Sequence, residues 1–260
     1  MQNMILVSSG DAITARLVEE AGFNGIWVSG FEASARLGLT DNGSITMTEM
    51  LNVAKPIVDA VKIPVYVDVD TGYGNFARTV REFEKIGVTG ICVQDDIPHL
   101  KTNSLWGGKA PLMDMKEFAK KINIKPRKIK IIARTEALIR GYGHDEAFKR
   151  LDMYKQYGAD ILLPHVRKSV DMFAGMQNKA GRHKAEIPYA IVPTKFPHYT
   201  NEQLFNKGYS MVIWANTTER VKIKAIRDSL KILKKDDSAI NIENKLSASL
   251  DDMRNLTPHE

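Results

Sequence analysis

The segment GVTGICVQ, residues Gly87–Gln94, contains the pattern that decides the fold. A stretch with helical spacing of apolar residues ends at Gly87, and an apolar run then leads to the polar Gln94. Glycine tolerates the left-handed backbone at a helix C-terminus. A short uninterrupted apolar run is typical of a strand that is buried on both faces. The segment therefore predicts a helix followed by a strand of a parallel sheet.

The same pattern recurs from one end of the chain to the other. Strands are expected at Ile5–Ser8, Gly25–Ser29, Val65–Asp68, Gly90–Gln94, Ile129–Arg134, Ile161–Leu163, Tyr189–Val192 and Met211–Trp214. Helices are expected between them, including Ala12–Ala21, Met47–Val61, Ala77–Ile86, Met113–Ile122 and Asp145–Tyr157. This alternation predicts the α/β class and a (β/α)8 TIM-type barrel over residues 1–235, with an open doubly wound sheet as the alternative.

Composition limits the possible classes of protein. The chain has 260 residues, 43% hydrophobic and 26% charged, which suits one large domain. Its single cysteine, Cys92, lies in an apolar run, so we expect neither a disulfide nor a thiolate metal site, and a cytoplasmic location. We predict no signal peptide and no membrane segment, because no apolar run approaches the roughly 18 residues that a spanning helix needs. The net charge of +6 comes from dispersed lysines, so we expect no nucleic-acid partner.

Residues 236–260 form a polar tail. Weakly apolar residues are spaced at helical intervals in it, at Leu246, Leu250, Met253 and Leu256. Such a weak apolar stripe has too little surface to fold alone. We therefore predict a helical extension that packs only against a neighbour.

Acidic residues follow the third predicted strand, within the segment DVDTGYGN, Asp68–Asn75. Active sites of (β/α)8 barrels lie at the C-terminal ends of the strands. Asp68 and Asp70 can both turn toward one hard cation at that junction, and Mg²⁺ takes one or two carboxylates in this way. The alternative is that Asp70 caps the next helix, ahead of Asn75.

A basic, amide-bearing loop follows the fourth strand. Lys101, Asn103 and Ser104 lie in the segment 97–111, whose length is typical of a lid. Solvated surface is the alternative for these side chains.

Arg134 ends the fifth strand and needs an anion, either Glu136 or a substrate group. His165, after the sixth strand, is either bonded to nearby backbone or a ligand-binding residue. Together these residues predict a metal-assisted site for a small phosphorylated acid.

Six segments carry a family resemblance. The chain resembles the phosphoenolpyruvate phosphonomutases, of the isocitrate lyase and phosphoenolpyruvate mutase superfamily, over roughly residues 9–225. The matching segments are Ala15–Phe23, Asp68–Asn75, Lys101–Leu105, Ile132–Ala137, Val192–Lys195 and Ser210–Asn216. The resemblance implies a Mg²⁺-dependent isomerase that interconverts phosphoenolpyruvate and phosphonopyruvate through an enolate, at the entry to phosphonate biosynthesis. It also implies a homotetramer, a dimer of dimers with an exchanged C-terminal helix.

The loop motif distinguishes the reactions within the superfamily. Its carbon–carbon lyases carry a Lys-Arg-Cys-Gly-His type sequence there, and its phosphonopyruvate hydrolases resemble the mutases but have threonine in place of Asn103. The sequence Lys101-Thr102-Asn103-Ser104 therefore favours the mutase. A phosphonopyruvate hydrolase and a lyase of 2-oxo or malate-type acids stay as alternatives, as does a lapsed enzyme that retains ligand binding.

The resemblance also assigns roles by position. Asp68 would bind Mg²⁺ directly, Asp70 would bind it through water, and Gln94 would act through water where the family has glutamate. Either Asp95 or Asp96 would restore the missing charge if the backbone shifts. The substrate would lie among Ser29, Gly30 and Phe31 around the pyruvyl oxygens, Asp41 near the migrating phosphoryl group, and Lys101, Asn103, Ser104, Arg134 and His165 around the phosphoryl group or carboxylate.

Overall fold

The strands form a closed parallel barrel. The computed structural model describes residues 2–170 and 187–257. Its strands are β1 Met4–Ser8, β2 Gly25–Val28, β3 Val65–Asp68, β4 Gly90–Gln94, β5 Lys130–Thr135, β6 Ile161–Pro164, β7 Ala190–Ile191 and β8 Met211–Trp214. They run in the order β6-β5-β4-β3-β2-β1-β8-β7. A parallel bridge between Leu162 and Tyr189 joins the two ends of this order, so the predicted barrel is confirmed and the open sheet is not.

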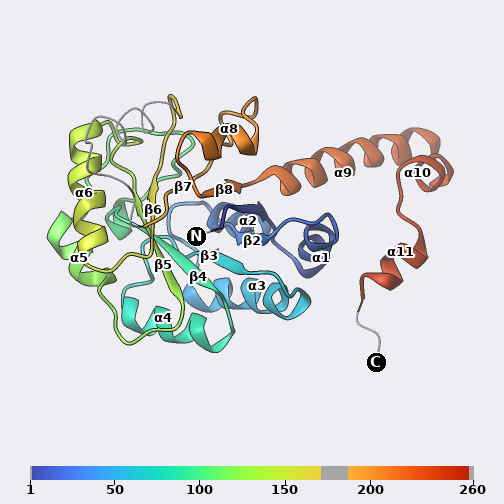
Figure 1. Cartoon of the computed structure of the whole chain (residues 1–260). Coiled ribbons are helices and arrows are strands. Elements are labelled where there is room, and N and C mark those ends of the chain that lie inside the picture. The colour runs from blue at the N-terminus through green and yellow to red at the C-terminus, as the bar shows by residue number, and fades with distance from the viewer. Residues whose placement is uncertain (1, 171–186, 258–260) are drawn as a thin grey trace.

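Helices surround the barrel (Figure 1). They are α1 Ala12–Glu20, α2 Gly30–Arg36, α3 Met47–Ala60, α4 Phe76–Lys85, α5 Met115–Ile122, α6 His144–Gln156, α8 Asn201–Asn206, α9 Thr217–Asp236, α10 Ile240–Lys245 and α11 Leu250–Asn255, with a 3₁₀ turn at Pro98–Leu100. The predicted helices and strands agree with these bounds to within one or two residues. The short helix α2 was not predicted, because it has seven residues and no extended apolar stripe.

Two sets of apolar side chains build the core. One set contains strand residues almost alone, among them Trp27, Tyr66, Cys92 and Ile132, and fills the barrel interior. The other set joins the opposite strand faces to the helices. Because side chains alternate along a strand, the residues two positions after these four also face the interior, at its C-terminal mouth. They are Ser29, Asp68, Gln94 and Arg134.

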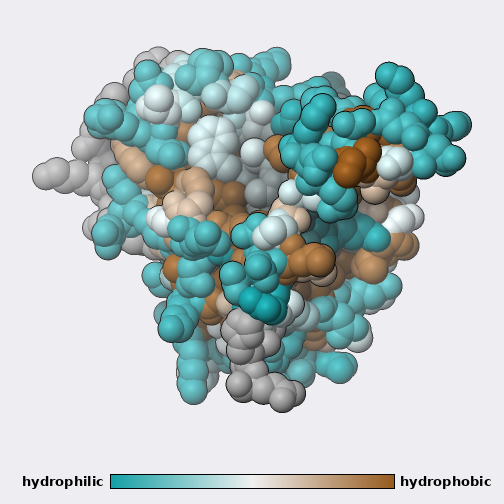
Figure 2. Space-filling model, turned by 90° about the vertical axis from the view of Figure 1, so that its right-hand side faces the viewer, coloured by the Kyte–Doolittle hydropathy of each residue, from teal (hydrophilic) through white to brown (hydrophobic). Residues whose placement is uncertain are grey.

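The C-terminal helices extend out from the barrel, and the end of α11 returns to α1, where Arg16 Nη1 donates to the Leu256 carbonyl at 2.9 Å. Helix α9 begins beside the barrel and extends away from it, and α10 and α11 continue the chain beyond its end (Figure 1). Viewed from that side, hydrophobic side chains are exposed among hydrophilic ones (Figure 2). The predicted division into a barrel and a tail, at residue 235, falls at the end of α9 and stays a prediction. Within residues 2–170 and 187–257, no helix has the length and apolar character that crossing a membrane requires.

Candidate active site

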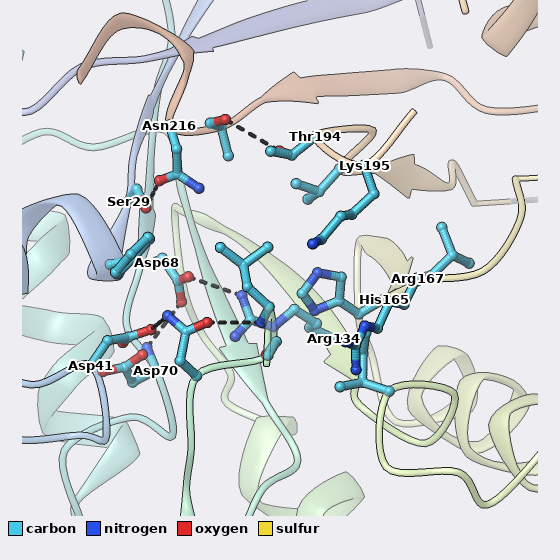
Figure 3. A pocket seen from close by; sticks show the side chains of 18 of the residues that line it. Ser29, Asp41, Asp68, Asp70, Arg134, His165, Arg167, Thr194, Lys195 and Asn216 are labelled. Carbon is cyan, nitrogen blue, oxygen red and sulfur yellow. Dashed lines mark hydrogen bonds and ion pairs between the residues drawn. The ribbon is translucent and has the colours of Figure 1, made fainter. Parts of the chain in front are cut away.

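The predicted strand-end residues meet around one cavity at the C-terminal mouth of the barrel (Figure 3). Its volume, about 70 Å³, has room for several water molecules, so it suits a small ligand. The predicted residues that line it are Ser29, Phe31, Asp41, Asp68, Asp70, Lys101, Asn103, Ser104, Arg134 and His165. The convergence of these side chains from different strands and loops supports one site.

The loop after β4 lies closed over this cavity. The Lys101 ammonium is 2.7 Å from Asp41 Oδ1 and 3.2 Å from Asp70 Oδ1. The Asn103 amide donates to Asp41 Oδ2 at 2.5 Å. Both loop side chains are buried, with Lys101 5% and Asn103 3% exposed, so they are not solvated surface. Burial alone would lower the pKa of Lys101, but the carboxylates of Asp70 and Asp41 outweigh it and raise that pKa, so the ammonium stays charged.

Two ion pairs and a hydrogen bond fix Arg134 and His165. Arg134 Nη1 donates to Asp68 Oδ2 at 2.9 Å, and Arg134 Nε lies 2.9 Å from Glu136 Oε1. His165 Nδ1 lies 2.8 Å from the same Glu136 oxygen. Burial would raise the pKa of Glu136, but His165 and Arg134 outweigh it and lower that pKa well below its usual value. Glu136 is thus the buried anion that positions the guanidinium and the imidazole.

Asp70 has a strained backbone and a buried carboxylate. Its φ of 48° lies in the left-handed region, and its amide N–H donates to Asp68 Oδ1 at 3.1 Å. The cap of the following helix is Asn75, so the alternative role of Asp70 as a helix cap is wrong. The pKa of Asp70 is raised to about 6. Burial is the largest cause, the charge of Lys101 opposes it, and the charges of Asp68 and Asp41 add to it. A carboxylate with a raised pKa would be stabilised in its charged form by a bound cation.

The N-terminal turn of α2 forms another wall of the cavity. Ser29 is the N-cap, and its hydroxyl donates to Asn216 Oδ1 at 3.3 Å. A Cβ added at Gly30 would lie 3.2 Å from Asp70 Oδ1, so glycine lets this turn approach the carboxylates closely. The N–H groups of the first helical turn have no partner within their own helix. The Glu32 N–H is capped by the Ser29 hydroxyl, which leaves the N–H groups of Gly30 and Phe31 available to anionic oxygen atoms.

Gln94 and the two aspartates after it are fully buried. Gln94 Nε2 donates to Asp96 Oδ2 at 2.7 Å, and Gln94 Oε1 has no hydrogen-bond partner among the described residues. Asp95 accepts from Thr135 Oγ1, from Tyr154 and from the Glu136 amide N–H. None of the three lines the cavity, and both aspartates are paired with arginines, so neither replaces the missing charge.

Four further polar or charged residues line the cavity. Arg167, Thr194, Lys195 and Asn216 also face the cavity, and the Lys195 side chain extends toward its middle (Figure 3). Thr194 and Lys195 follow β7 and Asn216 follows β8, so the sequence alone places them among the polar strand-end residues, although it assigns them no role. Arg167 is a loop arginine two residues after His165, and nothing in the sequence distinguishes it from solvated ones.

The donor set fits a divalent cation. Asp70 Oδ2 is a buried oxygen of the cavity lining without a hydrogen-bond partner among the described residues, and the Asp70 amide N–H is bonded to the Asp68 carboxylate. Gln94 Oε1 also lacks such a partner but does not line the cavity, so it would reach a cation only through water. Mg²⁺ prefers oxygen ligands and commonly takes only one or two protein carboxylates. Over the described ranges there is no cluster of three or more His, Cys, Asp or Glu side chains arranged to hold a metal. A cation held here would therefore depend on water or substrate for its remaining ligands.

Comparison with known proteins gives the family of this barrel and site. The family model described as phosphoenolpyruvate phosphomutase matches residues 1–234. The chain belongs to this family. The phosphoenolpyruvate phosphomutase of Tetrahymena pyriformis is 34% identical over 93% of this chain and 83% of its own length. The family's mutases are isomerases, so the chain is an enzyme of an isomerase family.

Solved structures of family members have the same fold. The phosphoenolpyruvate phosphomutase from Streptomyces platensis subsp. rosaceus superposes with a TM-score of 0.92 and 34% identity, over 98% of this chain and 91% of that chain. A phosphonopyruvate hydrolase in complex with oxalate and Mg²⁺ has a TM-score of 0.86 and 29% identity, over 98% and 89% of the two chains. The phosphoenolpyruvate phosphomutase family therefore contains close structural relatives that differ in reaction.

Proposed function

We propose that this protein is a Mg²⁺-dependent phosphonomutase that interconverts phosphoenolpyruvate and phosphonopyruvate. The observation that carries the proposal is the buried contact of Lys101 and Asn103 with Asp41, which holds the loop over the cavity. A phosphoryl group in transit between oxygen and carbon must be kept from water. A closed, buried lid with an amide and a cation provides that exclusion.

The residues around the cavity divide into groups that suit the two halves of the substrate. Arg134 and His165, positioned by Glu136, offer a cation and an N–H donor for the phosphoryl group. Ser29 and the N–H groups of Gly30 and Phe31 offer donors for the pyruvyl oxygens. These donors would stabilise the negative charge that the pyruvyl oxygen gains when the phosphorus–oxygen bond breaks. Asp41 keeps Lys101 and Asn103 over the phosphoryl group.

The carboxylates of Asp68 and Asp70 are the residues that would hold the metal, with Gln94 acting through water. A bound divalent cation supplies Lewis-acid stabilisation of charge on the pyruvyl oxygens. The hydrolase relative crystallised with oxalate and Mg²⁺ supports this choice of ion. We expect calorimetry to detect oxalate binding that requires Mg²⁺, and absence of any binding would favour a lapsed enzyme.

Phosphorus NMR tests the reaction directly. The purified protein is incubated with phosphonopyruvate and Mg²⁺, and phosphoenolpyruvate is expected to accumulate as the phosphonate signal is lost. A spectrum in which only inorganic phosphate appears would favour the hydrolase, whose relative shares this fold. If phosphonopyruvate is unchanged while a malate-type acid is cleaved to a 2-oxo acid, the lyase alternative is correct. No phosphoenolpyruvate under any condition contradicts the mutase.

A further inference from the structure

Arg140 is a buried arginine in the loop between β5 and α6 whose contacts reach two functional parts of the site. Its side chain has no solvent exposure. Its Nε and Nη2 donate to Asp96 Oδ1 and Oδ2 at 3.0 and 2.7 Å, a bidentate pair. Its Nη1 donates to Thr102 Oγ1 at 2.8 Å, and Nη2 also donates to the Thr102 carbonyl at 2.9 Å. Every guanidinium nitrogen therefore has a hydrogen-bond partner, and the side chain joins Asp96 to Thr102.

Successive side chains of the lid contact partners on opposite sides. Lys101 and Asn103 turn toward Asp41 at the cavity, while Thr102, which lies between them, is bound by Arg140 from the other side. An antiparallel bridge between Asp96 and Leu112 ties the two ends of the lid together. The lid backbone is thus clamped between Asp41 and Arg140. Replacement of Asp41 or of Arg140 would therefore release the lid backbone on the side that the replaced residue holds.

The same arginine fixes Asp96, and Asp96 fixes Gln94. Asp96 Oδ2 accepts from both Arg140 Nη2 and Gln94 Nε2. A carboxylate only accepts hydrogen bonds, so it binds the nitrogen of the Gln94 amide and leaves the oxygen as the free end. That oxygen is the buried atom without a partner among the described residues. The chain Thr102–Arg140–Asp96–Gln94 therefore connects the lid with Gln94, whose backbone N–H donates to the Asp70 carbonyl at 2.8 Å.

We propose that Arg140 is a positioning residue that couples closure of the lid to the orientation of Gln94, and that it thereby keeps water from the reacting phosphoryl group. The proposal rests on the proposed phosphonomutase function. With the clamp intact, the phosphorus–oxygen bond of phosphoenolpyruvate breaks and a phosphorus–carbon bond forms at carbon 3. With a loose lid, water attacks the phosphorus instead. From phosphonopyruvate, the phosphorus–carbon bond breaks, the water oxygen bonds to phosphorus to give inorganic phosphate, and the proton released from water is added to carbon 3 of the enolate to give pyruvate.

Arg140→Lys is the main test variant. Lysine keeps the charge beside Asp96 but has no planar fork, so it cannot bind Asp96 and Thr102 together. Thr102→Val is a second variant that removes the side-chain contact and leaves the carbonyl contact. Arg150→Lys is the matched control, because Arg150 pairs with the neighbouring buried Asp95 at 3.2 Å and binds the Met113 carbonyl instead of the lid. Circular dichroism confirms that each variant is folded.

The product ratio is the first measurement. Phosphorus NMR gives the ratio of inorganic phosphate to phosphoenolpyruvate formed from phosphonopyruvate. We expect this ratio to rise at least about tenfold in Arg140→Lys, since a misplacement of about 1 Å at a reacting centre can cost about a hundredfold. A smaller rise is expected in Thr102→Val and none in Arg150→Lys. A purely structural role would lower the stability of the Arg140 variant and leave the ratio at the wild-type value, which would overturn the proposal.

Trypsin cleavage of the lid is the second measurement and needs no activity. Lys101 is buried and held by the clamp, whereas Lys109 is exposed in the same loop and serves as an internal reference. We expect the rate of cleavage after Lys101, relative to Lys109, to rise about tenfold in Arg140→Lys, because local opening controls the cleavage of folded segments. Equal protection in wild type and variant contradicts the clamp. If the wild type forms no phosphoenolpyruvate, the mutase proposal fails while this measurement still decides the role of Arg140.

Discussion

Asn103 and Asp41 are 62 positions apart in the chain, yet their side chains are in contact. Sequence motifs indicated both residues separately, but the contact itself depends on the lid crossing over the loop after α2. The Asp41 side chain is only 9% exposed, so its carboxylate needs the two donors of the lid. At the residue scale, the site is therefore a set of paired charges instead of isolated catalytic groups.

Asn103→Ala should lower kcat/KM for phosphonopyruvate by roughly 10- to 100-fold, because a hydrogen bond to a charged group contributes about 1.5–3 kcal/mol. The variant leaves one oxygen of Asp41 without its donor and opens a path for water. A coupled assay for phosphoenolpyruvate measures the change. Asn52→Ala, on the exposed face of α3, is the control and should match the wild type. Equal activity of the two variants would remove Asn103 from the mechanism.

Asp11 links three helices at the element scale. It is the N-cap of α1, where its side chain accepts from the Thr14 amide at 2.7 Å. Arg36 of α2 and Lys222 of α9 each lie 2.6 Å from its other oxygen. Burial would raise the pKa of Asp11, but the bonds from Lys222, Thr14 and Arg36 outweigh it and lower that pKa well below its usual value. The beginning of α9 is thus anchored to the barrel by charge.

Asp11→Asn should destabilise the protein by no more than about 1 kcal/mol at pH 7, since asparagine still caps α1 and a partly exposed ion pair is screened by solvent. A carboxyl group whose pKa is lowered by folding stabilises the fold at pH values above its unfolded-state pKa. This stabilisation is lost progressively as the pH falls below that pKa. The difference between wild type and variant should therefore shrink below about pH 4. Urea denaturation at pH 7 and pH 3 measures it. A difference that is the same at both pH values would contradict the role of the charge.

The barrel interior and the C-terminal helices differ in packing at the scale of the whole molecule. Leu6, Ile132 and Ile213 lie in the interior with no exposure. In contrast, α9 to α11 leave apolar side chains in solvent, namely Val221, Ile223, Ile226, Leu230, Leu233, Ile240, Leu246, Leu250 and Met253 (Figure 2). Exposed apolar surface of this extent is typical of an interaction site. It supports the proposal that these helices pack against another copy of the chain in a homotetramer.

Leu6→Ala tests the barrel interior. Removing this buried side chain should cost about 2–5 kcal/mol in the free energy of unfolding, because a cavity remains among strands that cannot move together. Urea denaturation measures the change. Ile13→Ala, at a position on α1 that is 43% exposed, should change stability by less than about 0.5 kcal/mol. Similar losses in the two variants would mean that Leu6 does not support the core.

Val221→Glu tests the assembly. Val221 is 64% exposed on α9, so glutamate costs little in a single subunit but would place a charge in an apolar interface. Light scattering should show a tetramer for the wild type and smaller species for the variant. Lys235→Glu, near the end of the same helix, changes charge without removing an apolar side chain and is the control. A monomeric wild type would contradict the assembly.

The sequence by itself determined the barrel and most of the residues at its mouth. Helix-ending glycines and buried apolar runs are local signals, and the C-terminal ends of parallel strands necessarily meet at one rim. Asp68, Arg134 and His165 could therefore be assigned to one site before any contact was known. The motif around Asn103 likewise pointed to the reaction class.

Only the tertiary structure decided which of these groups are paired. The sequence left Asp95 and Asp96 as possible replacements for a missing charge, but each is held by a buried arginine from a later segment. Arg140 and Arg167 carry no local signal that separates them from surface arginines. Their partners are 38 and 61 positions away, at Thr102 and Trp106, and contacts of that separation depend on how the loops cross in space. A carboxylate's role depends on its nearest cation, and local sequence does not specify that neighbour.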